Sequence, residues 1–287
     1  MPAFNEASGI GSVLRTLLAS PEFGSDMEIV VAANGCTDDT AAIARSYGVR
    51  VVEIATASKA AALNAGDEVA TGEVRIYLDA DVPAGAGLLR ELAAALAEPG
   101  VAAAVPRPQV DTTGSSWPVR AYYEINSRLP VFRGRLFGRG VIALSAAGRA
   151  RFSRFPDLIA DDMFLDAVFA ADEKREIGAA VRVLPPRRAA DLVNRVARAR
   201  AGNAEFWQFM RSTPQEHRGS PDPVPEASSF SWLRDVLLRS PRLLPAAACY
   251  VLVVLLAEGR RRRSGWSARS GWGRPAAPAG GGATLDG

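Results

Sequence analysis

The stretch EIVVAANGCTDDTAAIARSYG, residues 28–48, contains an apolar run, a polar turn and a helical pattern in immediate succession. The run at 28–33 ends at Asn34-Gly35 and predicts a buried strand followed by a turn. Residues 37–40 (TDDT) supply N-cap side chains for the next helix, and Gly48 provides its stop. A strand that passes into a helix through a short polar loop indicates an α/β protein.

The same alternation continues on both sides of this stretch. Further strands are predicted at 49–54, 74–78 and 101–105, and further helices at 10–18, 58–70 and 87–97. Short loops in such an alternation are typical of right-handed crossovers in a mostly parallel central sheet flanked by helices. Polar motifs follow the strands at their carboxyl ends, the edge at which such sheets bind ligands. Residues 1–110 are therefore predicted to form a nucleotide-binding half.

The first helix lacks an obvious strand in front of it. Its apolar positions between Ile10 and Leu18 follow helical spacing, and the preceding segment, residues 2–6 (PAFNE), has the character of a loop entering a helix. Only Met1 comes before that loop. We therefore expect the first strand to be missing from this chain, leaving a neighbouring strand unpaired, and the natural protein to start some residues upstream.

The composition is that of a folded protein without a nucleic-acid footprint. Hydrophobic residues make up 48% and charged residues 23% of the 287 residues. The net charge is only +3, and four of the basic residues form the run 260–263, so a basic surface for nucleic acid is not expected. The single histidine, His217, argues against a histidine-rich metal site and leaves acid–base chemistry to carboxylates.

Cysteine usage points to a reducing compartment. Cys36 and Cys249 lie far apart and have no metal-ligand spacing, which makes a disulfide framework improbable. The first thirty residues lack the basic region and unbroken apolar core of a signal peptide. A cytoplasmic location is expected.

The second half of the chain has a different texture from the first. Aromatic residues and Gly- and Arg-rich turns become frequent after residue 110, and residues 111–215 are predicted to shape the site of a second substrate. Residues 216–263 are predicted to form a linker, proline-rich at 220–225, and an apolar helix. Residues 264–287, rich in Gly, Ala, Pro and Ser, are expected to be disordered.

The apolar stretch 243–257 is shorter than the roughly 20 residues that a membrane-spanning helix needs. Two interpretations stay open. It is either a buried core helix or a helix in peripheral contact with the inner face of the membrane, where the arginines at 260–263 would meet anionic lipid.

The strongest local signal for chemistry is IYLDADV, residues 76–82, in which Asp79 and Asp81 close an apolar strand. Alternation along a strand directs residues two apart to the same side. Two carboxylates at a strand end suit Mg²⁺ or Mn²⁺ that bridges a diphosphate. A solvated Asp-x-Asp turn is the alternative interpretation.

A second acidic pair, Asp161-Asp162, enters an apolar segment. The two side chains either cap a helix, whose N-terminus favours negative charge, or provide a general base whose pKa is raised by burial and by its like-charged neighbour.

Lys59 begins the segment SKAAALNAG, residues 58–66, and is one of only two lysines in the chain. A lysine at the start of a helix that follows a strand can reach a phosphate, helped by the free amides of the first turn. The alternative is an ordinary surface lysine.

Five motifs taken together resemble the family-two glycosyltransferases, which have the GT-A (Rossmann-like) fold. The motifs are PAFNE, VVAANGCTDDTAAIA, SKAAALNAG, YLDADV and ADDMFLD, in that order, within residues 2 to 210. The resemblance implies a metal-dependent transferase that moves a sugar from a nucleotide-diphosphate donor to an acceptor hydroxyl, lipid-linked or on a small molecule, with inversion. The implied cofactor is a divalent metal, Mg²⁺ or Mn²⁺.

Matching positions carry the roles of the family to this chain. Asp79 and Asp81 match the metal-binding motif, with Asp79 also on the donor side and Asp81 the stronger candidate for a direct ligand. Asp162 matches the base for the acceptor hydroxyl, and Asp161 is the weaker candidate. The remaining donor-side positions are Pro2, Ala3, Asn5, Glu6, Lys59, Arg195 and Arg198, and the acceptor-side positions are Gly138, Arg139 and Gly140.

Two departures from the family pattern bear on specificity. Ala33 stands where many relatives carry the first acid after the second strand, so recognition of the base would rest on Asn34 or Asp38. The Gln-x-x-Arg-Trp motif of processive polysaccharide synthases is missing, which favours transfer of one sugar per encounter.

Two other functions are compatible with this type of sheet. A sugar nucleotidyltransferase would need a Gly-rich, Arg-bearing phosphate loop after the first strand, and residues 5–8 (NEAS) do not form one. A catalytically silent nucleotide-sugar-binding protein would keep the fold, but the presence of both acidic motifs argues against it.

Overall fold

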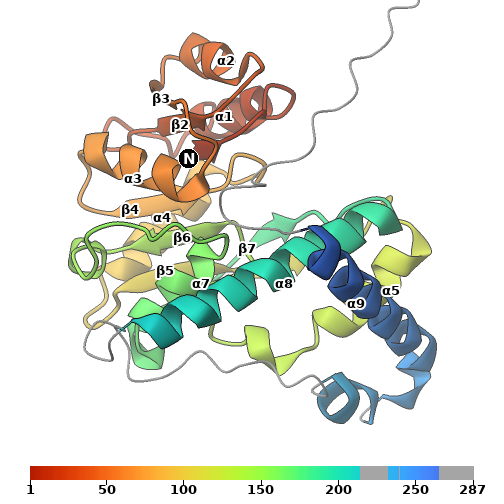
Figure 1. Cartoon of the computed structure of the whole chain (residues 1–287). Coiled ribbons are helices and arrows are strands. Elements are labelled where there is room, and N and C mark those ends of the chain that lie inside the picture. Colours follow the sequence, from red (N-terminus) through yellow and green to blue (C-terminus); the bar gives the residue numbers. More distant parts are fainter. Residues whose placement is uncertain (214–231, 239, 265–287) are drawn as a thin grey trace, which may run out of the picture.

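The computed structural model describes residues 1–213, 232–238 and 240–264 (Figure 1). The strands are β1 (Pro2–Ala3), β2 (Val30–Asn34), β3 (Arg50–Ile54), β4 (Arg75–Leu78), β5 (Ala103–Val110), β6 (Val141–Leu144) and β7 (Lys174–Val183). The helices are α1 (Ile10–Leu18), α2 (Thr40–Ser46), α3 (Lys59–Val69), α4 (Ala86–Leu96), α5 (Trp117–Asn126), α6 (Ala146–Arg149), α7 (Asp161–Val168), α8 (Ala189–Ser212) and α9 (Leu244–Ser264). The alternation predicted through residue 110 is confirmed.

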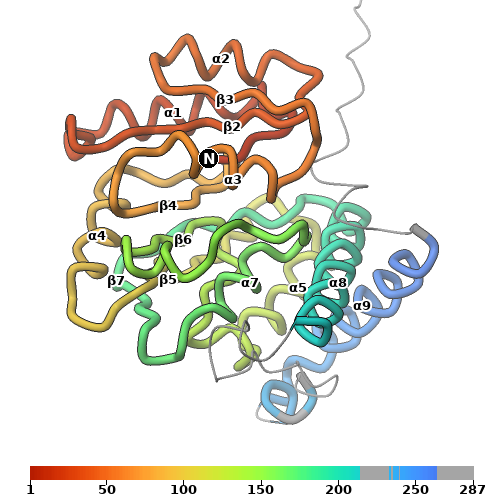
Figure 2. The backbone as a smooth tube through the Cα atoms, turned by 60° about the vertical axis from the view of Figure 1, so that its left-hand side comes forward, coloured from red at the N-terminus to blue at the C-terminus, as the bar shows by residue number. Residues whose placement is uncertain are grey.

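The strands of the described residues form two sheets, one from the first three strands of the chain and one from the remaining four. The first has the order β1-β2-β3, and both of its pairings are parallel. The second has the order β4-β6-β5-β7. Figure 2 shows β4 between the first sheet and β6, so the strands read as one continuous layer in that view.

The first strand, expected to be missing, is present as the two residues of β1. Pro2 and Ala3 are buried and pair in parallel with Ala32 and Ala33 of β2. The expectation failed because two residues are too few to show the alternation by which a strand is recognised in sequence. The PAFNE segment therefore contains the strand as well as the loop that follows it.

The second sheet is less parallel than expected. β6 runs antiparallel to both β4 and β5, whereas β5 and β7 are parallel. The four residues of β6 follow a Gly-rich turn and were not recognised as a strand. All four are buried, because alternate side chains of β6 face helices on opposite sides of the sheet.

Two helical layers cover this second sheet. On one face Val141 and Ala104 pack with Leu92 of α4. On the other face Ile142 and Ala103 pack with side chains from α3 and α7, such as Leu63 and Leu165. The packing brings α3 and α7 to the same face, where both begin beside the carboxyl end of β4.

Helix starts follow the predicted capping chemistry in part. Ser58 caps α3, because its hydroxyl accepts a hydrogen bond from the Ala61 N–H at 3.2 Å. The N-cap of α2 is Asp39, which lies within the predicted TDDT segment, but its side chain makes no capping hydrogen bond. The N–H of Thr40, the first residue of the helix, donates instead to Asp38 at 3.1 Å.

The C-terminal helix α9 lies along α8 and α5 (Figures 1 and 2). It extends from the predicted apolar stretch through the arginine run. A 23-residue segment, Pro241–Arg263, is long and apolar enough to cross a membrane by length and composition. The predicted linker at 220–225 lies outside the described residues, and so does the predicted tail 264–287 except for Ser264, which is the last residue of α9.

Candidate active site

The Asp-x-Asp motif lies where β4 leaves the sheet, directly beside the loop that precedes β6. The N–H of Asp79 donates to the carbonyl of Gly140 at 2.8 Å. Gly140 has a φ of +69°, and a Cβ at this position would lie 2.5 Å from Val82 Cγ2 and 3.2 Å from an Asp79 carboxylate oxygen. Only glycine fits, because both the backbone conformation and the space exclude a side chain.

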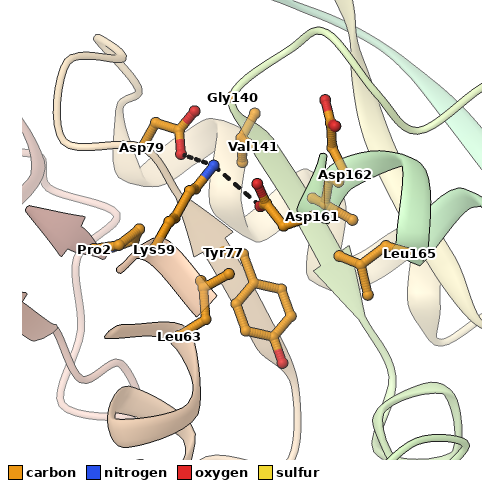
Figure 3. A pocket seen from close by; sticks show the side chains of 11 residues that line it. Pro2, Lys59, Leu63, Tyr77, Asp79, Gly140, Val141, Asp161, Asp162 and Leu165 are labelled. Carbon is orange, nitrogen blue, oxygen red and sulfur yellow. Dashed lines mark ion pairs between the residues drawn. The ribbon is translucent and has the colours of Figure 1, made fainter. Parts of the chain in front are cut away.

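Lys59, the first residue of α3, connects the two acidic motifs. Its ammonium nitrogen lies 2.9 Å from Asp79 Oδ1 and 3.0 Å from Asp161 Oδ2 (Figure 3). The pocket around this cation is lined by Pro2, Lys59, Leu63, Tyr77, Asp79, Gly140, Val141, Ile142, Asp161, Asp162 and Leu165. Asp79 and Asp161 lie about 20 and 100 residues after Lys59 in the sequence, and both contact its ammonium group. Lys59 is therefore part of the pocket and not an ordinary surface lysine.

The charges in this cluster depend on one another. Burial disfavours the charge on Lys59, but the carboxylates of Asp161 and Asp79 outweigh it and raise the pKa of the lysine. Burial raises the pKa of Asp161 to about 6 against the opposing effect of Lys59, with Asp162 and Asp79 raising it further. The lysine is therefore held as a cation beside a carboxyl group that titrates near neutral pH.

Asp162 lies beyond Asp161 as seen from Lys59 (Figure 3). Its carboxylate accepts hydrogen bonds from the N–H of Gly138 at 3.0 Å and of Met163 at 2.9 Å. Burial raises the pKa of Asp162, while Lys59 and the Gly138 N–H act in the opposite direction. Both acids occupy the first turn of α7, where negative charge is favoured, but the N-cap residue itself is Ala160, and both acids also line the pocket.

Arg198 of α8 brings a second positive charge to the cluster. Burial lowers its pKa, and the carboxylates of Asp161, Asp79 and Asp81 partly offset that effect. Arg195, one turn earlier, is exposed and donates to the carbonyl of Leu184 at 3.2 Å. Of the two predicted arginines, Arg198 is the one most closely coupled to the acids.

The two predicted donor loops are tied to each other. Asn5 has a φ of +52°, and its side-chain oxygen accepts from the Thr37 N–H at 2.8 Å. The N–H of Glu6 donates to the hydroxyl of Thr40 at 2.8 Å, and that of Ala7 donates to Asp38 at 3.1 Å. Asp38 therefore holds loops together through hydrogen bonds.

Asn34, the alternative candidate for base recognition, is fully buried at the end of β2. Neither its amide nitrogen nor its amide oxygen has a hydrogen-bond partner in the described part of the chain. A buried amide without partners is costly. Among the described residues, the Asn34 side chain makes no hydrogen bond, whereas the Asp38 carboxylate accepts hydrogen bonds from Ala7 and Thr40.

Arg139 does not reach the pocket. Its side chain is buried, and its guanidinium donates to Pro106 at 2.9 Å, to Phe137 at 2.8 Å and to the carboxylate of Glu176 at 2.6 Å. Arg139 therefore anchors the Gly-rich segment to β5 and β7, and its acceptor-side role is not supported by this geometry. Its neighbours Gly138 and Gly140 do contact the acidic motifs.

Sequence reasoning missed one functional neighbour of this site, Asp166. Its carboxylate is buried and accepts from the Leu136 N–H at 2.8 Å, and it lies 3.2 Å from Arg135 and 3.0 Å from Lys174. One signal was available, since Lys174 is the only lysine besides Lys59. Both lysines pair with carboxylates of α7, and this fixes the helix against its surroundings.

The residues present fit a divalent metal whose coordination is completed by oxygens of a bound substrate. Within the described residues no group of three or more His, Cys, Asp or Glu side chains is arranged to hold a metal ion by itself. Asp79 and Asp81 nevertheless offer carboxylate oxygens, the donor type that Mg²⁺ and Mn²⁺ prefer, and these ions commonly take further oxygens from substrate phosphates.

Comparison with known proteins identifies a family and related folds. The sequence model described as glycosyl transferase family 2 matches residues 1–157, more than half of the chain. A search of curated proteins found no match. The family match ends just before α7 and does not include Asp161 and Asp162.

Solved structures share the fold at low sequence identity. The mannosyltransferase PcManGT from Pyrobaculum calidifontis, in complex with GDP-Man and Mn²⁺, is 22% identical with a TM-score of 0.57, over 88% of this chain and 73% of that chain. Glucosyl-3-phosphoglycerate synthase from Mycobacterium tuberculosis, with Mn²⁺ and UDP-Glc, is 19% identical with a TM-score of 0.54, over 77% and 78%. Mannosyl-3-phosphoglycerate synthase from Rubrobacter xylanophilus is 16% identical with a TM-score of 0.51, over 77% and 76%.

These neighbours are GT-A glycosyltransferases, and their likeness shows the fold of this chain. The family match adds what low-identity structural likeness does not show. On that match, the chain belongs to glycosyl transferase family 2.

Proposed function

We propose that the protein transfers one sugar per encounter from a nucleotide-diphosphate donor to an acceptor hydroxyl, with inversion at the anomeric carbon. The observation that carries this proposal is the ion-pair cluster in which Lys59 bridges Asp79 and Asp161, next to Asp162. Such a cluster combines groups for a diphosphate with a carboxylate for a hydroxyl proton in one pocket.

The donor side consists of opposite charges around the end of β4. Asp79 and Asp81 would hold Mg²⁺ or Mn²⁺, and such an ion neutralises charge that develops on the leaving diphosphate. Lys59 and Arg198 bring positive charge to the same place. The presence of Mn²⁺ in solved neighbours supports a metal here.

Asp162 is our candidate for the base. In the proposed step its carboxylate takes the proton of the acceptor hydroxyl while that oxygen forms a bond to C1 of the sugar. The bond from C1 to the diphosphate oxygen breaks on the opposite face, and the nucleoside diphosphate leaves. The hydrogen bonds from Gly138 and Met163 orient the carboxylate, and burial raises its pKa, which favours proton uptake. Asp161 is the weaker candidate, because it already pairs with Lys59.

Nucleoside recognition is assigned to the tied loops that contain Pro2, Ala3, Asn5 and Glu6. Asn34 is preferred over Asp38 for the base, because its amide has no hydrogen-bond partner among the described residues, whereas Asp38 already accepts hydrogen bonds. The neighbours bind GDP-Man and UDP-Glc. The acceptor stays open between a lipid-linked and a small-molecule hydroxyl, and the cytoplasmic location stays a prediction.

A donor screen tests the proposal. The full chain would be incubated with Mn²⁺ and either GDP-Man or UDP-Glc, and the release of nucleoside diphosphate would be measured. Metal-dependent release is expected, and chelation should abolish it. A parallel incubation would contain a sugar 1-phosphate and a nucleoside triphosphate, and formation of a nucleotide sugar with release of pyrophosphate there would instead identify a nucleotidyltransferase. Binding of the donor without turnover in either incubation would identify a silent binding protein.

One variant tests the metal assignment separately. Asp81→Ala should weaken metal-dependent nucleotide binding in titration calorimetry, since it removes one of two carboxylate ligands. Asp172→Ala, an exposed acid in a different part of the surface, is the control and should bind as the wild type does. Unchanged binding in the Asp81 variant would contradict the assignment.

A further inference from the structure

Helix α9 has one open apolar face. Leu252, Leu255 and Leu256 are 56, 64 and 53% exposed, and Leu244, the first residue of the helix, is 60% exposed. At 100° per residue these leucines lie within one third of the helix circumference, together with the exposed small residues Pro245, Ala248 and Gly259. Large exposed leucines grouped on one helix face are uncommon on a soluble surface without a partner.

The opposite face of α9 is fixed to the domain. Cys249, Val253 and Ala257 are buried against α5 and α8. Tyr250 stacks on Tyr122 of α5 with ring centroids 5.1 Å apart. Because α9 packs along its whole apolar length, it could cross a bilayer only if this cluster separated.

The C-terminal end of α9 carries positive charge. Residues 260–263 are all arginine, and Arg262 and Arg263 continue the line of the leucine face. Glu258 neutralises part of this charge, since it pairs with Arg261 at 2.6 Å, with Arg262 at 3.0 Å and with Arg200 of α8 at 3.1 Å. The Arg200 pair fastens this end of α9 to α8 and leaves a net positive end next to the open leucines.

We infer that the open face of α9 is a docking surface for an anionic lipid bilayer. The leucines would enter the boundary between headgroups and acyl chains, and the arginines would lie on anionic headgroups. An apolar face that ends in a basic cluster matches the layering of such a membrane, where an apolar interior lies beneath negative charge. A protein partner would not require an apolar face that ends in a basic cluster. This inference does not depend on the proposed transfer reaction.

The two interpretations of the apolar stretch thus each describe one side of the same helix. One side is core, and the other side is interfacial. Docking would leave α8 and α5 on the side of α9 that faces away from the membrane, because both pack on its buried face.

Sedimentation with vesicles tests the docking surface. The full-length protein would be mixed with phosphatidylcholine vesicles with or without phosphatidylglycerol, and the bound fraction would be measured after centrifugation. Binding is expected to the anionic vesicles and to fall at high salt.

Two double variants separate the apolar and the charged contributions. Leu252→Gln with Leu256→Gln should reduce the partition coefficient at least about tenfold, since two apolar side chains no longer enter the lipid. Arg262→Gln with Arg263→Gln should reduce it about 30-fold on anionic vesicles only. The matched control is Val74→Gln with Leu184→Gln, two exposed apolar residues outside α9, which should bind as the wild type does. All variants change exposed side chains, and circular dichroism would verify their folding.

Four results would overturn the inference. The first is that the wild type stays in the supernatant with both kinds of vesicle, and the second is that the Leu252/Leu256 variant binds as well as the control. The third is that bound protein resists extraction with alkaline carbonate, which would mean that α9 spans the bilayer. The fourth is that the wild type is a dimer, the Leu252/Leu256 variant is a monomer and neither binds vesicles, which would make a second copy the partner. None of these measurements uses a donor, so their failure is distinct from failure of the proposed function.

Discussion

Lys59 and Asp161 form an ion pair across the pocket, with Nζ and Oδ2 3.0 Å apart. The pair joins the first residue of α3 to the first residue of α7 and buries both charges. Although the pair favours ionisation of the acid, burial dominates and the pKa of Asp161 is about 6 compared with 3.8 for an ordinary aspartate. A group of this kind leaves a signature in the pH dependence of stability.

Asp161 should make the protein less stable as pH rises from about 4 to 6. Between these values the folded state keeps a proton that the unfolded state has lost, so the free energy of unfolding decreases with pH. The contribution is about 3 kcal/mol, reached above pH 6. Asp161→Asn should lack this component. Urea unfolding at several pH values would show it as a difference between wild type and variant, with Asp172→Asn as the exposed control. Parallel pH profiles of wild type and Asp161→Asn would contradict the prediction.

Asp162→Asn should reduce transfer by about 10²–10⁴-fold, because the amide cannot take the acceptor proton. Donor binding should be retained, since the Asn oxygen can still accept the Gly138 N–H that holds the loop. Turnover would be measured by release of nucleoside diphosphate in the presence of acceptor, and binding by calorimetry. Asp172→Asn is again the matched control. A variant with full turnover would exclude Asp162 as the base.

Gly140→Ala should destabilise the protein more than Gly134→Ala. Both glycines have positive φ, +69° and +65°, so each substitution incurs a backbone cost of about 1–2 kcal/mol. Only the Cβ at Gly140 collides with Val82, and this overpacking adds about 1–3 kcal/mol. Chemical denaturation would measure the difference. Equal losses would mean that the loop moves away from the Asp-x-Asp motif without cost.

Asn34→Ala and Asn64→Ala should differ in how strongly they destabilise the protein. The amide of Asn64 exchanges two hydrogen bonds with the backbone of Phe155, at 3.0 and 2.8 Å, and its loss should cost about 2–3 kcal/mol. The Asn34 side chain has no hydrogen-bond partner within the part of the chain that the structure describes, so its loss should leave the free energy of unfolding within about 1 kcal/mol of the wild type.

The same pair of variants reports on nucleotide recognition. If Asn34 contacts the base, Asn34→Ala should weaken nucleoside diphosphate binding about tenfold, the equivalent of one hydrogen bond in a buried site. Asn64→Ala should bind normally once it is folded. Calorimetry with UDP and GDP would measure both. Normal binding by Asn34→Ala would return the assignment to other residues of the tied loops.

The local elements of this protein could be predicted because their signals are local. α1 follows from the spacing of Ile10 to Leu18, and α3 follows from the Ser58 cap and the apolar positions behind it. Asp79 and Asp161 were also visible as parts of short motifs. Hydrophobic periodicity and capping depend only on neighbouring residues, and sequence displays them directly.

Other features escaped because they depend on partners far away in the chain. β1 and β6 are too short to show a period, and they are strands only because β2, β4 and β5 supply hydrogen bonds. Arg139 and Asp166 resemble site residues or ordinary surface charges until Glu176 and Lys174 are placed beside them. Long-range pairing leaves no local mark in a single sequence.

The sequence by itself determined that the chain is an α/β protein with one acidic motif after a strand and a second at the start of an apolar segment. Only the tertiary structure decided that Lys59 joins these motifs, that Arg139 belongs to the core, and that α9 has one buried and one open face. The physical reason is that propensity and periodicity act over a few residues, whereas ion pairing and burial depend on which distant segments the fold brings into contact.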